Sequence, residues 1–182
     1  MVWIIVGVII FLLLIFIIFN YNSLVKVRNV VHDQWAQIEV LLKRRADLIP
    51  NLVETVKGYT KHESETLEAV IEARNKAVKA NNPNDEMQAN GELGSALKKL
   101  FALAEDYPDL KANTNFLDLQ NNLKETEDKI SYARQFYNDS VLKYKNKIEV
   151  FPSNMIASLF GFRAISFFEA NDEERANPKI KF

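Results

Sequence analysis

Residues 2–19 read VWIIVGVIIFLLLIFIIF, a stretch without a single charged or polar side chain. As an α-helix it is about 27 Å long, close to the ~30 Å hydrocarbon core of a bilayer. Trp3 and Tyr21 stand near its two ends, and aromatic side chains are enriched at membrane–water interfaces. A cleavable signal peptide would need a basic start and small residues at its cleavage site. This stretch instead ends in Phe19-Asn20-Tyr21, which are not small residues. The sequence therefore predicts an uncleaved, single-pass transmembrane anchor over residues 1–20.

All 23 Lys and Arg and all 24 Asp and Glu residues follow this anchor, so the remaining part is nearly neutral. Binding to nucleic acid requires a basic face that displaces counterions, and we therefore expect no nucleic-acid partner. The chain has no cysteine, which excludes disulfides and thiolate chemistry. Lys26 and Arg28 follow the apolar stretch, so the positive-inside rule favours a domain on the cytoplasmic side of the cell membrane.

Beyond the anchor, apolar residues recur every three or four positions, which is the helical period. Four such stripes run over residues 24–42, 53–71, 93–104 and 116–148. Four helices with short connections bury their stripes best as an up-and-down bundle. The predicted fold is all-α, with the anchor followed by a four-helix bundle of long helices over residues 21–151.

Pro50 allows two interpretations. Lys43, Arg44 and Arg45 suit the C-terminus of a helix and Asp47 suits an N-cap, which favours a tight turn near Ala46. In this interpretation the three basic residues form a solvated helix end rather than a contact with anionic lipid. The chain would then return toward the membrane and bring Phe162 beside Tyr21. Alternatively, the apolar stripe nearly keeps its phase across Pro50, as in one long, kinked helix.

Other boundaries follow from local signals. Asn84 or Asp85 is a plausible N-cap after the turn cluster around Pro83, and Asn113 or Thr114 can cap the last long helix. Phe151-Pro152 ends that helix, because the residue before proline is disfavoured in the α region.

Polar residues at core positions raise the question of chemistry. Glu63 falls in a core position, as does Thr126 or Glu127, and we interpret them as rim residues or buried hydrogen-bonding groups. The alternative is an enzyme or a metal-binding bundle with a site at these residues. Neither His32 nor His62 has a Glu three residues earlier, and residue 66 is Thr where a zinc-protease motif requires a second His. We therefore predict no catalytic, cofactor-binding or metal-binding residues, no small-molecule substrate and no enzymatic activity.

Residues 152–182 form an apolar tail segment with a polar C-terminus. Its apolar residues are Met155, Ile156, Leu159, Phe160, Phe162, Ile165, Phe167 and Phe168. The segment either docks on the bundle or dips into a bilayer surface. Tyr132, Phe136, Tyr137 and Tyr144 form an aromatic cluster that we interpret as core and rim packing.

Five blocks, in order, resemble the LemA family. They are YNSLVKVRNVV from Tyr21, KRRADLIPNLVETVKGY from Lys43, YPDLKAN from Tyr107, YARQFYNDSV from Tyr132 and FPSNMIASLFGF from Phe151. The resemblance runs from about Tyr21 to Phe168, and residues 171–182 carry no recognisable family signal.

The resemblance implies a bacterial single-pass membrane protein with a helical bundle that faces the cytoplasm. Proteins of this family are regarded as interaction or membrane-organising proteins, with a relative in magnetosome formation, and no catalytic residues are implied. We accordingly predict a membrane-anchored scaffold that contacts the lipid bilayer and a membrane or membrane-associated protein partner.

Overall fold

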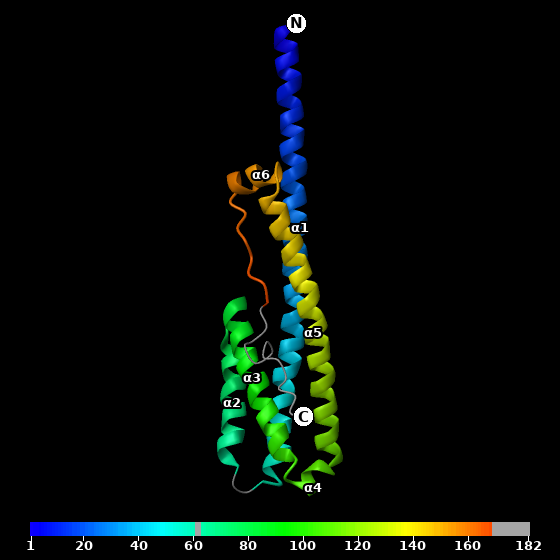
Figure 1. Ribbon diagram of the computed structural model, residues 1–182, viewed down its shortest axis with the longest axis vertical. Helices are drawn as coiled ribbons and strands as arrows, with labels where there is room; N and C mark the ends of the chain where they lie inside the picture. Colours follow the sequence, from blue (N-terminus) through cyan, green and yellow to red (C-terminus); the bar gives the residue numbers. More distant parts are fainter. Residues whose placement is uncertain (61–62, 169–182) are drawn as a thin grey trace, which may run out of the picture. The chain divides into compact units, whose positions relative to one another are not determined.

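A computed structural model describes residues 1–60 and 63–168 (Figure 1). The helices, in order, are α1 (Val2–Lys57), α2 (Ser64–Lys79), α3 (Pro83–Ala104), α4 (Pro108–Lys111), α5 (Thr114–Glu149) and α6 (Ser153–Leu159). No strand occurs in these residues, which confirms the predicted all-α class. The chain divides into two compact units. The anchor unit contains residues 1–37 and 133–167, and the bundle unit contains residues 38–132 together with Phe168.

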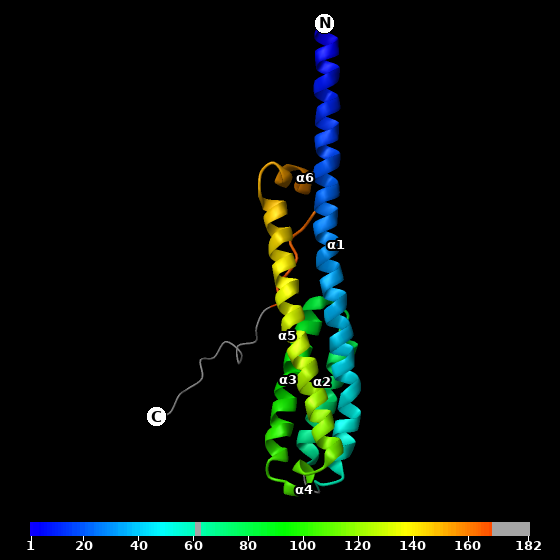
Figure 2. The ribbon, with the colours of Figure 1, turned by 90° about the vertical axis from the view of Figure 1, so that its right-hand side faces the viewer.

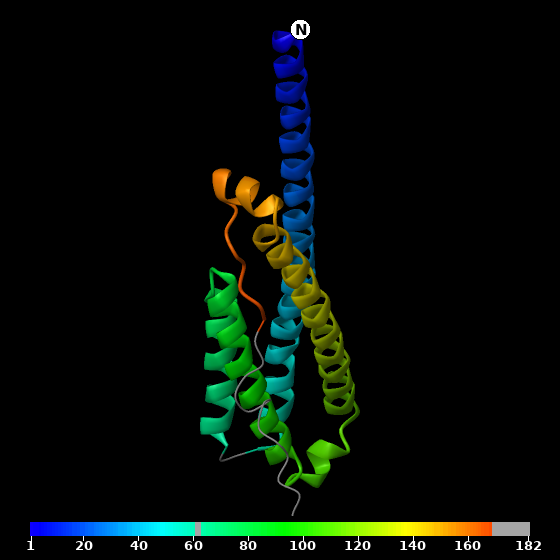
Figure 3. The same ribbon diagram turned by 45° about the horizontal axis from the view of Figure 1, so that its top comes forward.

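In the bundle unit, segments of α1 and α5 pack with α2 and α3 around one apolar core. Consecutive long helices run in opposite directions, as Figures 1 and 3 show, and the predicted up-and-down arrangement is confirmed. The short α4 connects α3 to α5 and buries Leu110. Core residues from the four long helices include Ile49, Leu52, Val56, Leu67, Val70, Leu93, Leu97, Leu100, Phe116 and Leu123.

The predicted turn near Ala46 is wrong, because α1 continues through Pro50 as far as Lys57. Proline has no N–H group, so the Ala46 carbonyl loses the donor that residue 50 would supply. The Arg74 side chain of α2 replaces it, with Nε donating to the Ala46 oxygen at 3.3 Å. Ile49 and Val53 on either side of Pro50 are buried in the same core, so tertiary packing favours the uninterrupted helix.

The longer α1 changes the boundaries that follow it. Val53 and Val56 belong to α1, and the second helix begins only at Ser64. The N-cap of α3 is Asn82 rather than Asn84 or Asp85, since its side-chain oxygen accepts from the Asp85 N–H at 3.0 Å. At the start of α5, the Asn113 side-chain oxygen accepts from the Phe116 N–H at 3.0 Å. Of the two predicted N-caps, Asn113 and Thr114, it is therefore Asn113 that caps α5. The expected end of α5 before Pro152 is confirmed.

In the anchor unit, the apolar stretch forms the first part of α1. By length and composition this helix can cross a membrane, and its most apolar window is not buried inside the protein. Every residue from Val2 to Leu14 is exposed. A helix that exposes an apolar surface all round is typical of a membrane span rather than of a water-soluble helix.

The helix α6 packs across α1 just beyond this stretch (Figure 2). Ile156 and Ala157 of α6 are buried together with Leu24, and Ile17 packs against the same cluster. The helix ends at Leu159, and Gly161 shortly after it has a φ of 70°, in the left-handed region that favours glycine. The Phe162 N–H then donates back to the Ala157 carbonyl at 2.9 Å, which folds the Phe162 side chain onto the cluster.

Two buried tyrosines of α5 hold the extended segment that follows α6. The Tyr144 hydroxyl donates to the Arg163 carbonyl and the Tyr137 hydroxyl donates to the Ser166 carbonyl, each at 2.9 Å. Burial raises the pKa of both phenols. The other two members of the predicted aromatic cluster, Tyr132 and Phe136, are exposed.

The apolar tail therefore docks in part. Ile156 and Phe168 are buried and Phe162 is half-buried, whereas Met155, Leu159 and Phe160 remain exposed. The Phe162 ring centroid lies 5.8 Å from that of Tyr21, so their predicted proximity is confirmed although the turn near Ala46 is absent. The longer α1 still leaves the four long helices alternating in direction. Residues 169–182 lie outside the described residues.

Candidate functional site

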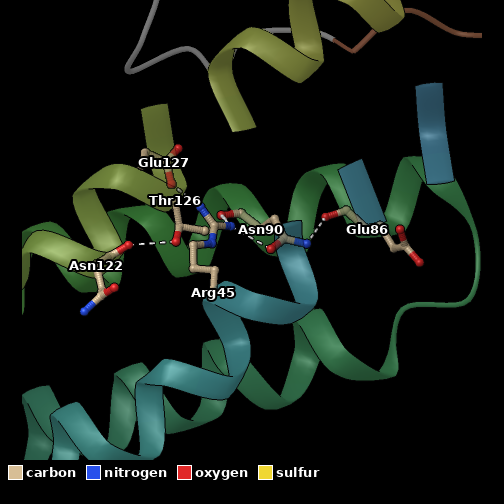
Figure 4. Close-up of polar contacts among 6 residues, drawn as sticks. All are labelled: Arg45, Glu86, Asn90, Asn122, Thr126 and Glu127. Atoms are coloured by element: carbon tan, nitrogen blue, oxygen red, sulfur yellow. Dashed lines mark hydrogen bonds and ion pairs between the residues drawn. The ribbon is translucent and has the colours of Figure 1, made fainter. Parts of the chain in front are cut away.

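Arg45 of α1 is the main buried charge of the bundle unit. Only 1% of this residue is exposed. Its guanidinium donates to the Glu127 carboxylate of α5 at 2.6 Å and to the Asn90 side-chain oxygen of α3 at 2.6 Å (Figure 4). A further donation reaches the Asn90 backbone carbonyl at 3.0 Å. Arg45 thus links three helices at one point.

This placement corrects the interpretation of Lys43, Arg44 and Arg45 as a solvated helix end. Lys43 and Arg44 are exposed, but Arg45 lies three residues after Leu42 and four before Ile49, both of which are buried. Residues at these spacings share one face of a helix. Since α1 does not end near Ala46, the side chain of Arg45 lies on the core face.

The polar core positions found in the sequence have separate partners. Thr126 is fully buried and its hydroxyl donates to the Asn122 carbonyl at 2.7 Å, while the Glu127 side chain is 48% exposed and pairs with Arg45. Glu63 accepts from the Tyr107 hydroxyl at 3.0 Å, a hydrogen bond that raises the pKa of Tyr107. The interpretation of these residues as rim or buried hydrogen-bonding groups is confirmed.

A groove of about 440 Å³ lies beside this cluster, between α1, α2 and α3. Its lining includes Leu42 and Ala46 at the base and five charged side chains, namely Glu39, Lys43, Asp47, Arg74 and Glu86. Lys43 and Asp47 pair with each other at 2.9 Å. Asn90 lines the same groove, so the cluster around Arg45 forms part of its wall.

Glu86 is the unsatisfied acid of the groove. Its Oε2 atom is buried and accepts no hydrogen bond within the described residues. Burial raises the pKa of this carboxyl, and the Glu39 carboxylate raises it further. The Glu86 carbonyl, in contrast, accepts from the Asn90 side-chain amide at 2.9 Å, which orients Asn90 toward Arg45. The groove can therefore receive a hydrogen-bond donor or a cation at Glu86.

The chemistry that this arrangement supports is binding. Within residues 1–60 and 63–168, no three His, Cys, Asp or Glu side chains lie close enough together to hold a metal ion. His32 is exposed on α1, and His62 lies outside the described residues. The absence of enzymatic activity stays a prediction.

The sequence profile of the LemA family matches residues 34–182. The chain belongs to the LemA family. The matched range begins later than the expected Tyr21, and it includes residues 171–182, for which the sequence blocks predict no family signal. It also includes Arg45, Asn90 and Glu127, the members of the buried polar cluster.

Curated relatives of this LemA-family chain include two kinds of protein. Protein LemA of Metamycoplasma hominis is 25% identical over 157 residues, which cover 86% of this chain and 72% of the relative. Magnetosome protein MamQ 2 of Paramagnetospirillum magneticum is 23% identical, and the match covers 90% of this chain and 71% of the relative. Magnetosome protein MamQ of Magnetospirillum gryphiswaldense is 22% identical with the same coverage.

Proposed function

We propose that this chain is a membrane-anchored helical scaffold that binds a membrane or membrane-associated protein and has no catalytic activity of its own. The anchor would confine the bundle to one surface and so raise its effective concentration for partners in the same membrane. The similarity to magnetosome proteins supports a role in organising a membrane. The observation that carries the proposal is the groove beside Arg45, with its unsatisfied Glu86.

The buried cluster prepares this groove for binding. Arg45 fixes α1 to α3 and α5 through charge-assisted hydrogen bonds, and Arg74 fixes α2 to α1. Walls that are already fixed lose little conformational entropy when a partner binds. A partner segment that places a lysine, an arginine or a backbone N–H against Glu86 would satisfy the carboxylate oxygen that has no donor among residues 1–60 and 63–168.

We also propose that the bundle faces the cytoplasm. Lys26 and Arg28 follow the apolar stretch within ten residues of its end, as the positive-inside rule requires of a cytoplasmic flank. The cysteine-free chain allows a direct check through Lys43→Cys. Labelling by a membrane-impermeant maleimide only after the cells are opened would support this orientation, and labelling of intact cells would contradict it.

The binding proposal can be tested by photo-crosslinking in native membranes. A photoreactive residue replaces Val78, an exposed residue of the groove, and a matched control replaces Leu117, which is exposed on α5 outside the groove. We expect a discrete adduct with another protein from position 78, no such adduct from position 117, and loss of the first adduct in a Glu86→Lys background. Identical adducts from both positions, or none from position 78, would contradict the assignment of this groove.

A further inference from the structure

The exposed surface of α6 and of the turn before it is apolar. Val150, Phe151, Met155, Leu159 and Phe160 all expose roughly half or more of their surface, with Phe151 and Leu159 above 70%. They fall within eleven consecutive residues. Clustered apolar exposure of this kind marks an interaction surface, because water-soluble proteins seldom leave it uncovered.

The position of α6 on α1 indicates what covers this surface. Ile17, which lies inside the apolar stretch, packs against the cluster of Leu24, Ile156 and Ala157. Residues 17 and 24 are separated by about 10 Å along a helix. If residues 2–19 fill the hydrocarbon core, α6 therefore lies at the level where hydrocarbon gives way to headgroups.

The aromatic side chains around α6 are also of a type found at the boundary between hydrocarbon and headgroups. The Tyr21 ring lies 4.9 Å from that of Phe160 and 5.8 Å from that of Phe162, centroid to centroid. Tyrosine is enriched at membrane–water interfaces, where its ring is apolar and its hydroxyl is hydrated. Amphipathic helices with Phe and Leu on one face bury that face about 5–10 Å into this zone.

The anchor unit, which contains α6, is also rich in basic residues. The anchor unit contains seven Lys and Arg against three Asp and Glu, a formal net charge of +4. The rest of the chain contains 16 basic and 21 acidic residues, a net charge of −5. The Arg28 guanidinium lies 5.1 Å from the centre of the Phe162 ring. Arg163, which follows Phe162 in the sequence, is exposed. Basic residues near a span favour anionic headgroups.

We propose that α6 is a second membrane contact, whose exposed apolar residues lie in the headgroup region of an anionic bilayer beside the transmembrane part of α1. Phe151, Met155, Leu159 and Phe160 enter the interface, and Arg28 and Arg163 bind anionic lipid headgroups. This inference rests on the membrane anchor of the proposed function. It does not depend on a protein partner, so the contact of α6 with the bilayer and the binding of a partner in the groove can fail independently.

The experiment measures the depth of α6 in a bilayer. The purified full-length chain is labelled at a single cysteine with an environment-sensitive fluorophore and reconstituted into vesicles of phosphatidylglycerol and phosphatidylcholine. Leu159→Cys and Met155→Cys report on α6, and Asp139→Cys, exposed on α5 in the same unit, is the matched control. Far-UV circular dichroism verifies that each labelled chain keeps its helix content. Quenching is compared between aqueous iodide and lipids brominated near the headgroup.

We expect lipid-borne quenching at positions 155 and 159, with iodide quenching at least threefold weaker there than at position 139. Replacing phosphatidylglycerol by phosphatidylcholine should reduce the lipid-borne quenching at position 159. Equal iodide quenching at positions 159 and 139 would overturn the proposal. Protection from iodide without lipid-borne quenching would also overturn it, because it would indicate that a second copy of the chain covers α6.

Discussion

At the scale of single residues, the Arg45 pair is asymmetric. The arginine is buried and the Glu127 side chain is half exposed, so water can solvate the carboxylate but not the guanidinium if either partner is removed. A buried charge without its counter-ion is costly, whereas an apolar side chain of similar volume in its place often costs little. Asn90 would still lose a donor in the second case.

This asymmetry predicts that the exposed partner is the more sensitive to mutation. Glu127→Ala should lower the free energy of unfolding by about 3–5 kcal/mol, and Arg45→Met by about 1–3 kcal/mol for the unsatisfied Asn90 oxygen. Glu125→Ala removes an exposed pair with Lys129 on the same helix and should cost less than about 1 kcal/mol. Urea unfolding of the detergent-solubilised chain measures all three. Equal effects of Glu127→Ala and Glu125→Ala would show that the buried arginine does not depend on its counter-ion.

At the scale of elements, α1 shows what could be read from the sequence. The apolar period predicted four long helices, as observed, but the predicted stripe over residues 53–71 is divided between α1 and α2. Local signals at Pro50 indicated a turn, and they failed because the group that replaces the missing N–H comes from Arg74, in another helix. The burial of Arg45 was missed for a related reason. Its partners, Asn90 and Glu127, lie 45 and 82 residues away in sequence.

A double-mutant cycle tests the compensation at Pro50. Arg74→Ala should lower the free energy of unfolding by about 1–2 kcal/mol, because it leaves the Ala46 carbonyl without a donor. In a Pro50→Ala background the same substitution should cost about 1 kcal/mol less, since residue 50 then supplies its own N–H to that carbonyl. The cycle cancels the loss of Arg74 packing, which is common to both backgrounds. An equal cost with and without Pro50 would mean that Arg74 does not compensate for the proline.

At the scale of the whole molecule, this LemA-family protein carries a first helix that can cross a membrane by its length and composition. The apolar stretch could be read directly from the sequence, because length and composition alone define a span. The groove beside Arg45 and the apolar surface of α6 could not, since each depends on contacts between distant segments. From the sequence alone, the tail can either dock on the bundle or contact a bilayer. Ile156 and Phe168 are buried in the protein, and contact of the exposed tail residues with a bilayer stays a proposal.

The most direct test of membrane anchoring is extraction of isolated membranes with alkaline carbonate at high salt. Peripheral contacts such as that proposed for α6 are weakened by salt, whereas a spanning helix is held by burial of its apolar surface. We predict that the full-length chain remains in the membrane fraction, while a chain beginning at Tyr21, which keeps α6 and its basic residues, is released. Release of the intact full-length chain would contradict the assignment of residues 2–19 as a transmembrane anchor.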